Sequence, residues 1–439
     1  MQAPKSERPV FPRRLSLPGR VLYAVRHSLP FATNGYAVRT HGVARALSQS
    51  GCEVLVCTAP GLPWNQPGQG DRDWSNHHSI DGVRYIHTPH FSTTERSPKE
   101  CHQRLVQTYA ELIRVFKPAV VMAASNWANA LPPAAAARAS NLPFLYEVRG
   151  FWELTRLARE PAWEGSPDYR QARMMEQDVV RRAQRLFTLN RFMRDELAQR
   201  GVPAERIDLV PNGFDGWAPA PDGSDGLRRQ LGVKARHVVG YIGSFNAYEG
   251  LEDLIGAVAR LRAQGLDLAL MLVGSSSRMG MEDQTDSGLC PAGQAYQALA
   301  KQLGISKHLY LPGRIKPAAV ADYYGLLDLV VIPRRPLPVC ELVSPLKPLE
   351  AAAHDKRVLM SDVAPLAELR SRCSNFFYFK KGQPDTMAEQ MQNILSNHAD
   401  PPTRCHSLED LTWCENVRPM VRAINACGGN FVLERSTCV

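Results

Sequence analysis

Short apolar runs alternate with longer segments of mixed polarity along most of the chain. The runs at 20–25 and 52–58 are rich in valine, leucine and alanine or cysteine. Apolar runs of this length are typical of strands that are buried on both faces of a parallel sheet. The segment between these two runs places Val43 and Leu47 on one helical face. The pattern therefore predicts βαβ units and an α/β fold with a doubly wound parallel sheet.

The same alternation occurs a second time in the later half of the chain. Strands are expected at 237–242 and 268–273, with a helix at 249–262 between them. Residues 217–226 hold two prolines, two glycines and two aspartates, a composition typical of a linker between domains. We predict a disordered basic arm at 1–19, a Rossmann-like domain at 20–216, a linker at 217–234 and a second Rossmann-like domain at 235–410.

The composition is that of a soluble globular protein. Of the 439 residues, 44% are hydrophobic and 22% are charged, and the length is enough for two domains of ordinary size. No apolar run reaches the roughly 18–20 residues needed to span a bilayer. The N-terminus also lacks the apolar segment of a signal peptide. We therefore expect a cytoplasmic protein.

The cysteine and histidine residues show no metal-binding spacing. The ten cysteines include no C-x-x-C pair, and the twelve histidines are scattered. We expect free thiols in a reducing compartment rather than a disulfide framework or a zinc site.

The chain is basic, with a formal net charge of +9 and a pI near 9.1. This balance favours an acidic partner: nucleic acid, an anionic membrane surface or phosphorylated substrates. The charge is spread along the chain rather than clustered with aromatic residues, which argues against nucleic acid. The arginines between 170 and 200 form the densest group, although a solvated helix face explains them equally well.

One stretch, 339–353, combines charge with the predicted start of a helix. An apolar strand at 329–332 precedes it, and a helix is expected from Pro348 onward. Helix N-termini favour anions because their first amides are unpaired and carry partial positive charge. The nearby cations are Arg334, Arg335 and Lys347.

Two carboxylates, Glu341 and Glu350, flank these cations. Carboxylates beside a phosphate site are suited to accept hydrogen bonds from sugar hydroxyls. The pattern thus favours a site for a phosphorylated sugar, while a loop and an amphipathic helix without a ligand remain an alternative.

Other turns and strand ends add candidates to this site. Gly35 follows a predicted strand, where it lets a backbone approach a ligand or simply forms a tight turn. Arg149 and Glu147 stand at a strand's carboxyl end, the edge where ligands bind in such sheets. An exposed ion pair of Arg149 with Glu147 or Glu153 at the strand end is the alternative for them.

A long loop at 59–82 contains Asp71-Arg72-Asp73. This matches the Asp-x-Asp pattern of metal-dependent glycosyltransferases of another fold, but there the motif follows an apolar strand. Here polar residues surround it, so we expect a loop that contacts the acceptor.

Four segments together resemble the retaining glycosyltransferases of family 4, which have the GT-B fold. They are PLKPLEAAA, VPNGFD, YEVRGFWE and the turns at Gly243 and Gly274. The resemblance implies two Rossmann-like domains that face each other across a cleft, with the acceptor on the first and the nucleotide sugar on the second. It also implies that residues 411–439 form a helix returning to the first domain, plus a tail.

The resemblance assigns roles and also exposes departures from the family. Glu350 is implied to hold the ribose, and Glu341 the sugar, although eight residues separate them here instead of seven. Arg149 stands where many members have histidine. Ser244 and Glu249 stand where the family has an arginine and a lysine that grip the diphosphate. The catalytic candidates are Glu341, Arg149 and Glu147, and the donor-binding candidates are Gly35, Asn212, Gly243, Ser244, Gly274, Arg314, Arg334, Arg335, Lys347, Leu349 and Glu350.

These observations predict a retaining hexosyltransferase that moves a sugar from a UDP- or GDP-linked donor to a glycan or lipid-linked acceptor in cell-surface polysaccharide synthesis. No metal or other cofactor is expected, because the leaving diphosphate itself can take the acceptor's proton. Peripheral attachment to the inner face of an anionic membrane would suit the basic charge. The alternatives are a nucleotide-sugar epimerase or hydrolase of the same fold, and a non-catalytic scaffold that binds a nucleotide sugar.

Overall fold

The computed structural model describes residues 16–65, 75–88, 97–218, 223–276, 289–397, 402 and 404–427. The Asp71-Arg72-Asp73 pattern, most of the N-terminal arm and the C-terminal tail lie outside these residues.

Eight strands form the first sheet, in the order β3-β4-β2-β1-β5-β6-β7-β8. All neighbours are parallel except β3, which is antiparallel to β4 at one edge. The apolar runs seen in the sequence are its central strands, and β1 and β5 are buried almost throughout. The strands are β1 (Arg20–Val25), β2 (Glu53–Thr58), β3 (His77–Ile80), β4 (Val83–Ile86), β5 (Val120–Ala124), β6 (Phe144–Val148), β7 (Arg185–Thr188) and β8 (Ile207–Leu209).

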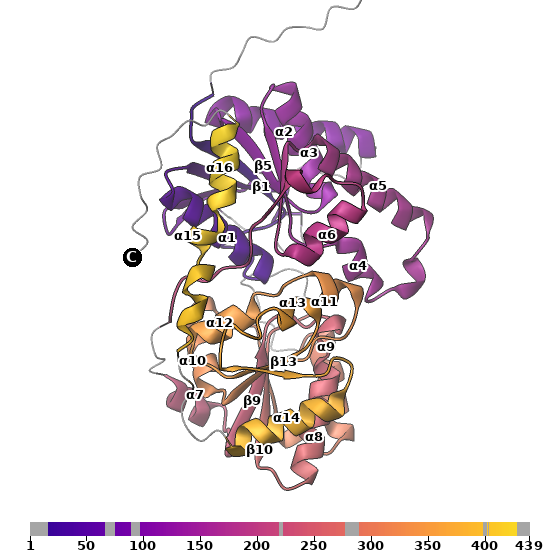
Figure 1. Cartoon of the computed structure of the whole chain (residues 1–439), viewed down its shortest axis with the longest axis vertical. Coiled ribbons are helices and arrows are strands. Elements are labelled where there is room, and N and C mark those ends of the chain that lie inside the picture. Colours follow the sequence, from indigo (N-terminus) through magenta and orange to yellow (C-terminus); the bar gives the residue numbers. More distant parts are fainter. Residues whose placement is uncertain are drawn as a thin grey trace, which may run out of the picture.

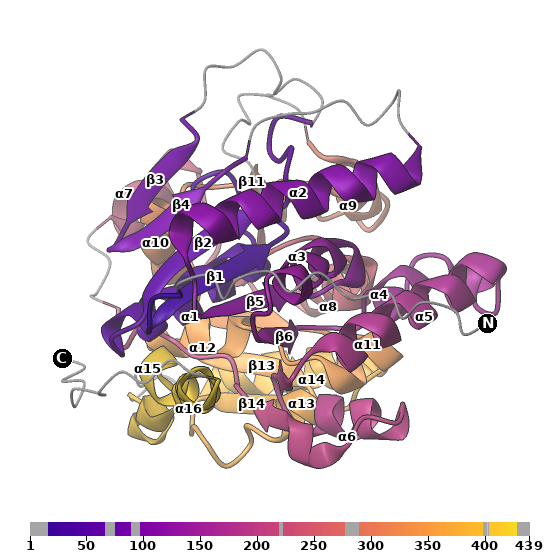
Figure 2. The ribbon, with the colours of Figure 1, turned by 90° about the horizontal axis from the view of Figure 1, so that it is seen from above.

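Helices cover both faces of this sheet. One face packs against α1, and the other packs against α2, α3, α5 and α6. Helices α2 and α3 lie side by side (Figure 2). The helices are α1 (Gly35–Gln49), α2 (Pro98–Phe116), α3 (Trp127–Ala139), α4 (Trp152–Leu157), α5 (Pro167–Arg182) and α6 (Arg191–Gln199).

The second sheet has six parallel strands in the order β11-β10-β9-β12-β13-β14. Its two faces carry separate apolar cores. The strands are β9 (His237–Ile242), β10 (Leu268–Val273), β11 (Leu309–Gly313), β12 (Leu329–Ile332), β13 (Val358–Ser361) and β14 (Phe376–Phe379). The helices are α7 (Ser224–Gln230), α8 (Leu251–Ala263), α9 (Pro291–Gln302), α10 (Val320–Leu326), α11 (Pro338–Leu342), α12 (Lys347–Ala353), α13 (Ala364–Ala367) and α14 (Pro384–Asn397).

The last two helices lie against the first sheet although they follow the second (Figure 1). They are α15 (Trp413–Asn416) and α16 (Arg418–Ala426). Trp413, Met420 and Ile424 are buried in the same core as Val21 and Tyr23 of β1. The two-sheet α/β architecture predicted from the sequence is therefore confirmed. In the described parts of the chain, no helix is both long and apolar enough to cross a bilayer.

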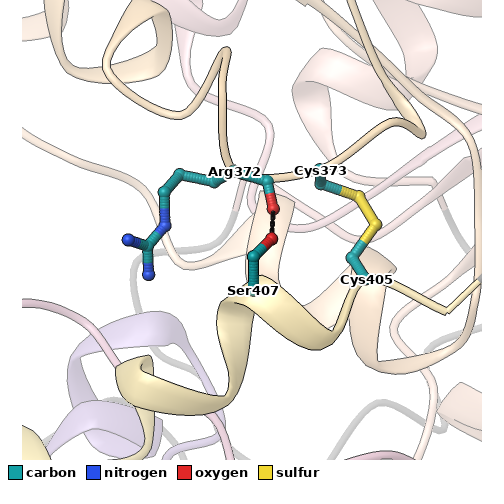
Figure 3. Close-up of a disulfide and its surroundings, with 4 residues drawn as sticks. All are labelled: Arg372, Cys373, Cys405 and Ser407. Carbon is teal, nitrogen blue, oxygen red and sulfur yellow. Dashed lines mark hydrogen bonds between the residues drawn. A yellow bond between two sulfur atoms is a disulfide. The ribbon is translucent and has the colours of Figure 1, made fainter.

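A disulfide joins Cys373 to Cys405 (Figure 3). It connects the segment before β14 with the segment that leads to α15. The hydroxyl of Ser407 donates a hydrogen bond to the carbonyl of Arg372 beside it. The expectation that the cysteines are free thiols is therefore wrong for this pair. Sequence spacing could not reveal it, because the two residues lie 32 positions apart and meet only through the fold.

Reduction of this disulfide is expected to lower the free energy of unfolding by about 2 to 4 kcal/mol, since it closes a loop of moderate length in the unfolded chain. Urea denaturation with and without reductant measures the change. The Cys373→Ser variant should match the reduced wild type and show no response to reductant. Thiol titration of unfolded, unreduced protein should find two fewer reactive thiols than after reduction, and equal counts would contradict the disulfide.

Candidate functional site

The carboxyl ends of strands from both sheets contribute to one region between the domains. The amide Nδ2 of Asn190, after β7, donates to the Leu342 carbonyl at 2.8 Å and to Ser344 Oγ at 2.7 Å. Asn212, after β8, donates to the Ser344 carbonyl at 2.9 Å. Gly35, the first residue of α1, also lies close to this stretch, because a Cβ added to it would lie 3.5 Å from Leu346 Cδ1. The stretch singled out in the sequence thus lies against the first domain.

Arg334 and Lys347 converge on one buried carboxylate, Glu249. Lys347 Nζ lies 3.2 Å from Glu249 Oε1, and the Arg334 guanidinium lies 3.3 Å from the same oxygen. Arg334 also donates to the Val343 carbonyl at 2.7 Å. Burial opposes ionisation of Glu249, but Lys347 and Arg334 hold its pKa below the usual value. The carboxylate offsets part of the positive charge at this place.

Arg335 points away from this group. Its guanidinium pairs with Asp253 at 3.0 Å and with Glu252 at 3.2 Å, both on α8. The predicted grouping of three cations is therefore wrong, because only two of them come together. The two arginines follow the end of β12, in a segment without regular structure, and their side chains contact different partners.

Glycines make room for the Lys347 side chain. Gly243 has φ +150°, and a Cβ there would lie 2.4 Å from Lys347 Cε. Gly274 has φ +143°, and a Cβ there would lie 1.8 Å from the Gly243 carbonyl oxygen. The two turns are therefore packed backbone against backbone. The neighbouring Ser244 accepts a hydrogen bond from the Tyr241 hydroxyl through its carbonyl, at 2.9 Å.

Glu350 and Glu341 differ in how their carboxylates are engaged. Within the described residues, the side-chain carboxylate of Glu350 takes part in no hydrogen bond or ion pair, and burial raises its pKa. Glu341 Oε1 lies 2.7 Å from Lys381 Nζ, and its Oε2 accepts from the Ala364 amide at 3.0 Å. Glu350 is thus available to a ligand, whereas a ligand would compete with Lys381 for Glu341.

Three further candidates have other surroundings. Leu349, predicted as a donor-binding residue, is 5% exposed, and its side chain packs in the apolar core of the second domain. The amide of Asn212 bonds to the Ser344 carbonyl and to Arg39, at 2.9 Å each, and so joins the two domains. Arg314 directly follows β11, and burial lowers its pKa.

Glu147 and Arg149 form a buried ion pair. Arg149 Nε lies 2.8 Å from Glu147 Oε2, and Arg39 Nε lies 2.8 Å from Oε1. The Tyr23 hydroxyl donates to the same carboxylate. Glu147 has no exposed surface and the Arg149 side chain is 6% exposed. The ion pair raised as the alternative is present, but it is buried rather than exposed as expected. This placement argues against direct catalysis by either residue.

Sequence reasoning missed Arg39, which links several elements. Besides Glu147, it donates to the Val210 carbonyl at 2.7 Å and to the Pro211 carbonyl at 3.1 Å. A signal was present, since Arg39 lies four residues before Val43 on the apolar face of α1 and is 2% exposed. Lys381 was missed as well, and it gave no signal because it follows a different strand.

A metal site is not formed by the described residues: none of their histidine, cysteine, aspartate and glutamate side chains gather in groups of three or more that could hold an ion.

Comparisons with known proteins agree with this architecture. Residues 34–213 match the family described as glycosyl transferase 4-like domain. Residues 236–397 match the family described as glycosyl transferases group 1.

Relatives are similar over parts of the chain. The lipopolysaccharide 1,2-N-acetylglucosaminetransferase of Salmonella typhimurium is 27% identical over 38% of this chain and 41% of its own length. D-inositol 3-phosphate glycosyltransferase 1 of Catenulispora acidiphila is 26% identical over 69% of this chain and 68% of its own. The chain thus spans well under two thirds of the first relative and about two thirds of the second.

Solved structures share the fold along nearly the whole chain. Sucrose-phosphate synthase from Thermosynechococcus elongatus superposes with a TM-score of 0.69 at 16% identity, covering 93% of this chain and 99% of its own. Anabaena HepE in complex with UDP-glucose superposes with a TM-score of 0.62 at 16% identity, covering 93% and 97%. Both halves are matched in order and the two-domain fold is shared, so the chain is a glycosyltransferase with the GT-B fold, in which a glycosyl transferase 4-like domain precedes a glycosyl transferases group 1 domain.

Proposed function

We propose that the protein is a retaining hexosyltransferase that transfers a sugar from a nucleoside-diphosphate donor. The observation that carries this proposal is the unengaged carboxylate of Glu350, on the first turn of α12 and one turn from Lys347. This carboxylate has free lone pairs that can accept hydrogen bonds from ribose hydroxyls. The neighbouring cation, Lys347, can bind the negative diphosphate of the same nucleotide. HepE, which shares the fold, binds UDP-glucose.

The chemistry asks little of protein side chains as acids or bases. The bond between the sugar and the diphosphate breaks more readily when cations stabilise the growing negative charge. Lys347, at the start of α12, can supply such a charge. Arg314 is a second cation and directly follows β11, the edge strand of the second sheet. The leaving diphosphate takes the proton of the acceptor hydroxyl, so we propose that no metal or protein nucleophile takes part.

The acceptor in this proposal is a glycan or a lipid-linked glycan bound by the first domain. Relatives are named as a lipopolysaccharide N-acetylglucosaminetransferase, a phosphatidylinositol monomannoside mannosyltransferase and an alpha-galactosylglucosyldiacylglycerol synthase, and all three names contain a glycan or a lipid. The net charge of +9 would favour contact with the inner face of an anionic membrane.

The epimerase or hydrolase alternative is less well supported by the geometry. It needs a carboxylate base at the sugar, and Glu341 was the candidate. Both oxygens of Glu341 are engaged by Lys381 and the Ala364 amide, which weakens it as a base. The scaffold alternative predicts nucleotide binding without sugar transfer.

A thermal-shift screen with UDP, GDP, ADP, CMP and dTDP tests the donor site. One nucleotide at 100 times its Kd should stabilise the folded protein by about 2.7 kcal/mol. The Glu350→Ala variant should lose most of this shift, and Glu389→Ala, which removes an exposed carboxylate of the same domain, should retain it. No shift with any nucleotide would overturn the donor site.

A turnover assay with a nucleotide-sugar donor distinguishes a transferase from a hydrolase and from a non-catalytic scaffold. Release of the nucleoside diphosphate from its sugar donor only when an acceptor is present supports transfer, and NMR of the product's anomeric carbon tests retention. Release without an acceptor supports hydrolysis, and binding without release supports the scaffold.

A further inference from the structure

Two positions beside the β9–α8 turn set this chain apart from the family it resembles. The resemblance places Ser244 and Glu249 where the family has an arginine and a lysine that bind the diphosphate. Glu249 is a carboxylate with 1% exposure, so a negative charge is buried where a positive one is expected. A buried carboxylate is retained only when nearby cations and donors compensate its desolvation.

Lys347 and Arg334 supply that compensation, but in different ways. Arg334 is 5% exposed, and its two terminal nitrogens donate to the Val343 carbonyl and to Glu249. The Lys347 side chain is 16% exposed, and among the described residues its ammonium has Glu249 as its one hydrogen-bond partner. An ammonium has three donors, so two of those on Lys347 are free for a ligand.

Lys347 reaches this place across the β9–α8 turn. Its ammonium lies 5.1 Å from the centre of the Tyr241 ring. Its Cε occupies the space that a side chain on Gly243 would fill, 2.4 Å from where that Cβ would be. Lys347 is therefore held at this turn by three neighbours: Gly243, which leaves room for it, the Tyr241 ring and the Glu249 carboxylate. The resemblance places the family's own cations at the same turn.

We propose that Glu249 is a positioning residue that holds Lys347 across the Gly243 turn as the cation that binds the donor's diphosphate, an inference that rests on the proposed function. Arg334 is the second counter-ion of Glu249 and lies behind it. In this proposal Lys347 of α12 takes over the role that the family gives to a cation on the turn. Glu249, at the place of the family's lysine, holds Lys347 there.

Titration calorimetry with UDP and UMP tests the role of Lys347, with GDP and GMP in their place if the nucleotide screen selects guanine. Lys347→Met should weaken the diphosphate by roughly 10- to 100-fold, the effect of one charge-assisted hydrogen bond, and the monophosphate much less. Arg260→Met, which removes a cation from the outer side of α8, should change neither. Equal losses for both ligands would overturn the inference while the proposed function stands.

Glu249→Gln gives a test whose sign is decisive. The change makes the site more positive, so simple attraction predicts tighter binding of the diphosphate. A positioning role predicts weaker binding, by about 10-fold for one misplaced charge-assisted bond. Tighter binding would show that Glu249 merely opposes the phosphate and would overturn the inference.

Gly243→Ala completes a cycle with Lys347→Met. The added Cβ should displace the lysine and weaken the diphosphate, and the double variant should be no weaker than Lys347→Met alone. Additive losses would place the effect of Gly243 elsewhere and contradict its part in the proposal. If the wild-type protein binds none of these nucleotides, the inference and the proposed function both fall.

Discussion

Replacing Glu147 with alanine is expected to destabilise the first domain by about 3 to 5 kcal/mol, because two buried guanidinium groups lose their common partner. Arg39 and Arg149 each donate to one oxygen of this carboxylate, and all three side chains are almost fully buried. Urea denaturation of the two proteins measures the loss.

Glu53→Ala is the matched control for this prediction. Glu53 also pairs with two arginines, Arg20 and Arg84, but 42% of its side chain is exposed. Ion pairs in that setting contribute at most about 1 kcal/mol. Equal losses of unfolding free energy for Glu147→Ala and Glu53→Ala would show that burial of the carboxylate does not determine the cost of its removal.

Acid titration gives an independent signature of the same network. Burial opposes ionisation of Glu147, but Arg149 and Arg39 hold its pKa at about 2, below the usual 4.5. A depressed pKa contributes stability above the unfolded pKa, and this contribution is lost as the pH falls from about 4.5 toward 2. The Glu147→Ala variant should therefore show a smaller decrease in unfolding free energy over that window than the wild type.

The strands could be predicted from the sequence because burial on both faces leaves a direct record in residue type. The runs at β1, β5 and β9 consist almost entirely of apolar residues, and their order along the chain implied βαβ crossovers. Short motifs in each half predicted that the two halves form the two domains of one fold. The two family models match these halves in the same order along the chain.

Side-chain direction could not be predicted in the same way. Arg334 and Arg335 are neighbours in sequence, yet one faces Glu249 and the other faces α8. The charge of Glu249 suggested a departure from the family, but its two partners come from segments 85 and 98 residues away. Such pairings depend on how β12 and α12 are placed in three dimensions, which local patterns do not encode.

Trp413→Ala is expected to cost about 3 to 5 kcal/mol, the range for removing a large buried aromatic side chain. Trp413 is 4% exposed and lies in the core of the first domain, although it follows the second domain in sequence. A Cβ on Gly42 would lie 2.4 Å from its ring, so α1 is shaped to receive it. The Arg39 guanidinium lies 5.6 Å from the ring centre.

The loss should reach the region between the domains as well as the core. Asn416, on the same short helix α15, donates to the Asn212 carbonyl at 3.2 Å, and Asn212 in turn donates to the Ser344 carbonyl at 2.9 Å. Releasing α15 removes one support of that connection. Arg418→Ala, a change on the neighbouring helix at a side chain that is 66% exposed, is the control and should leave the urea midpoint unchanged. If Trp413→Ala lowers the midpoint no more than this control, the C-terminal helices do not stabilise the first domain.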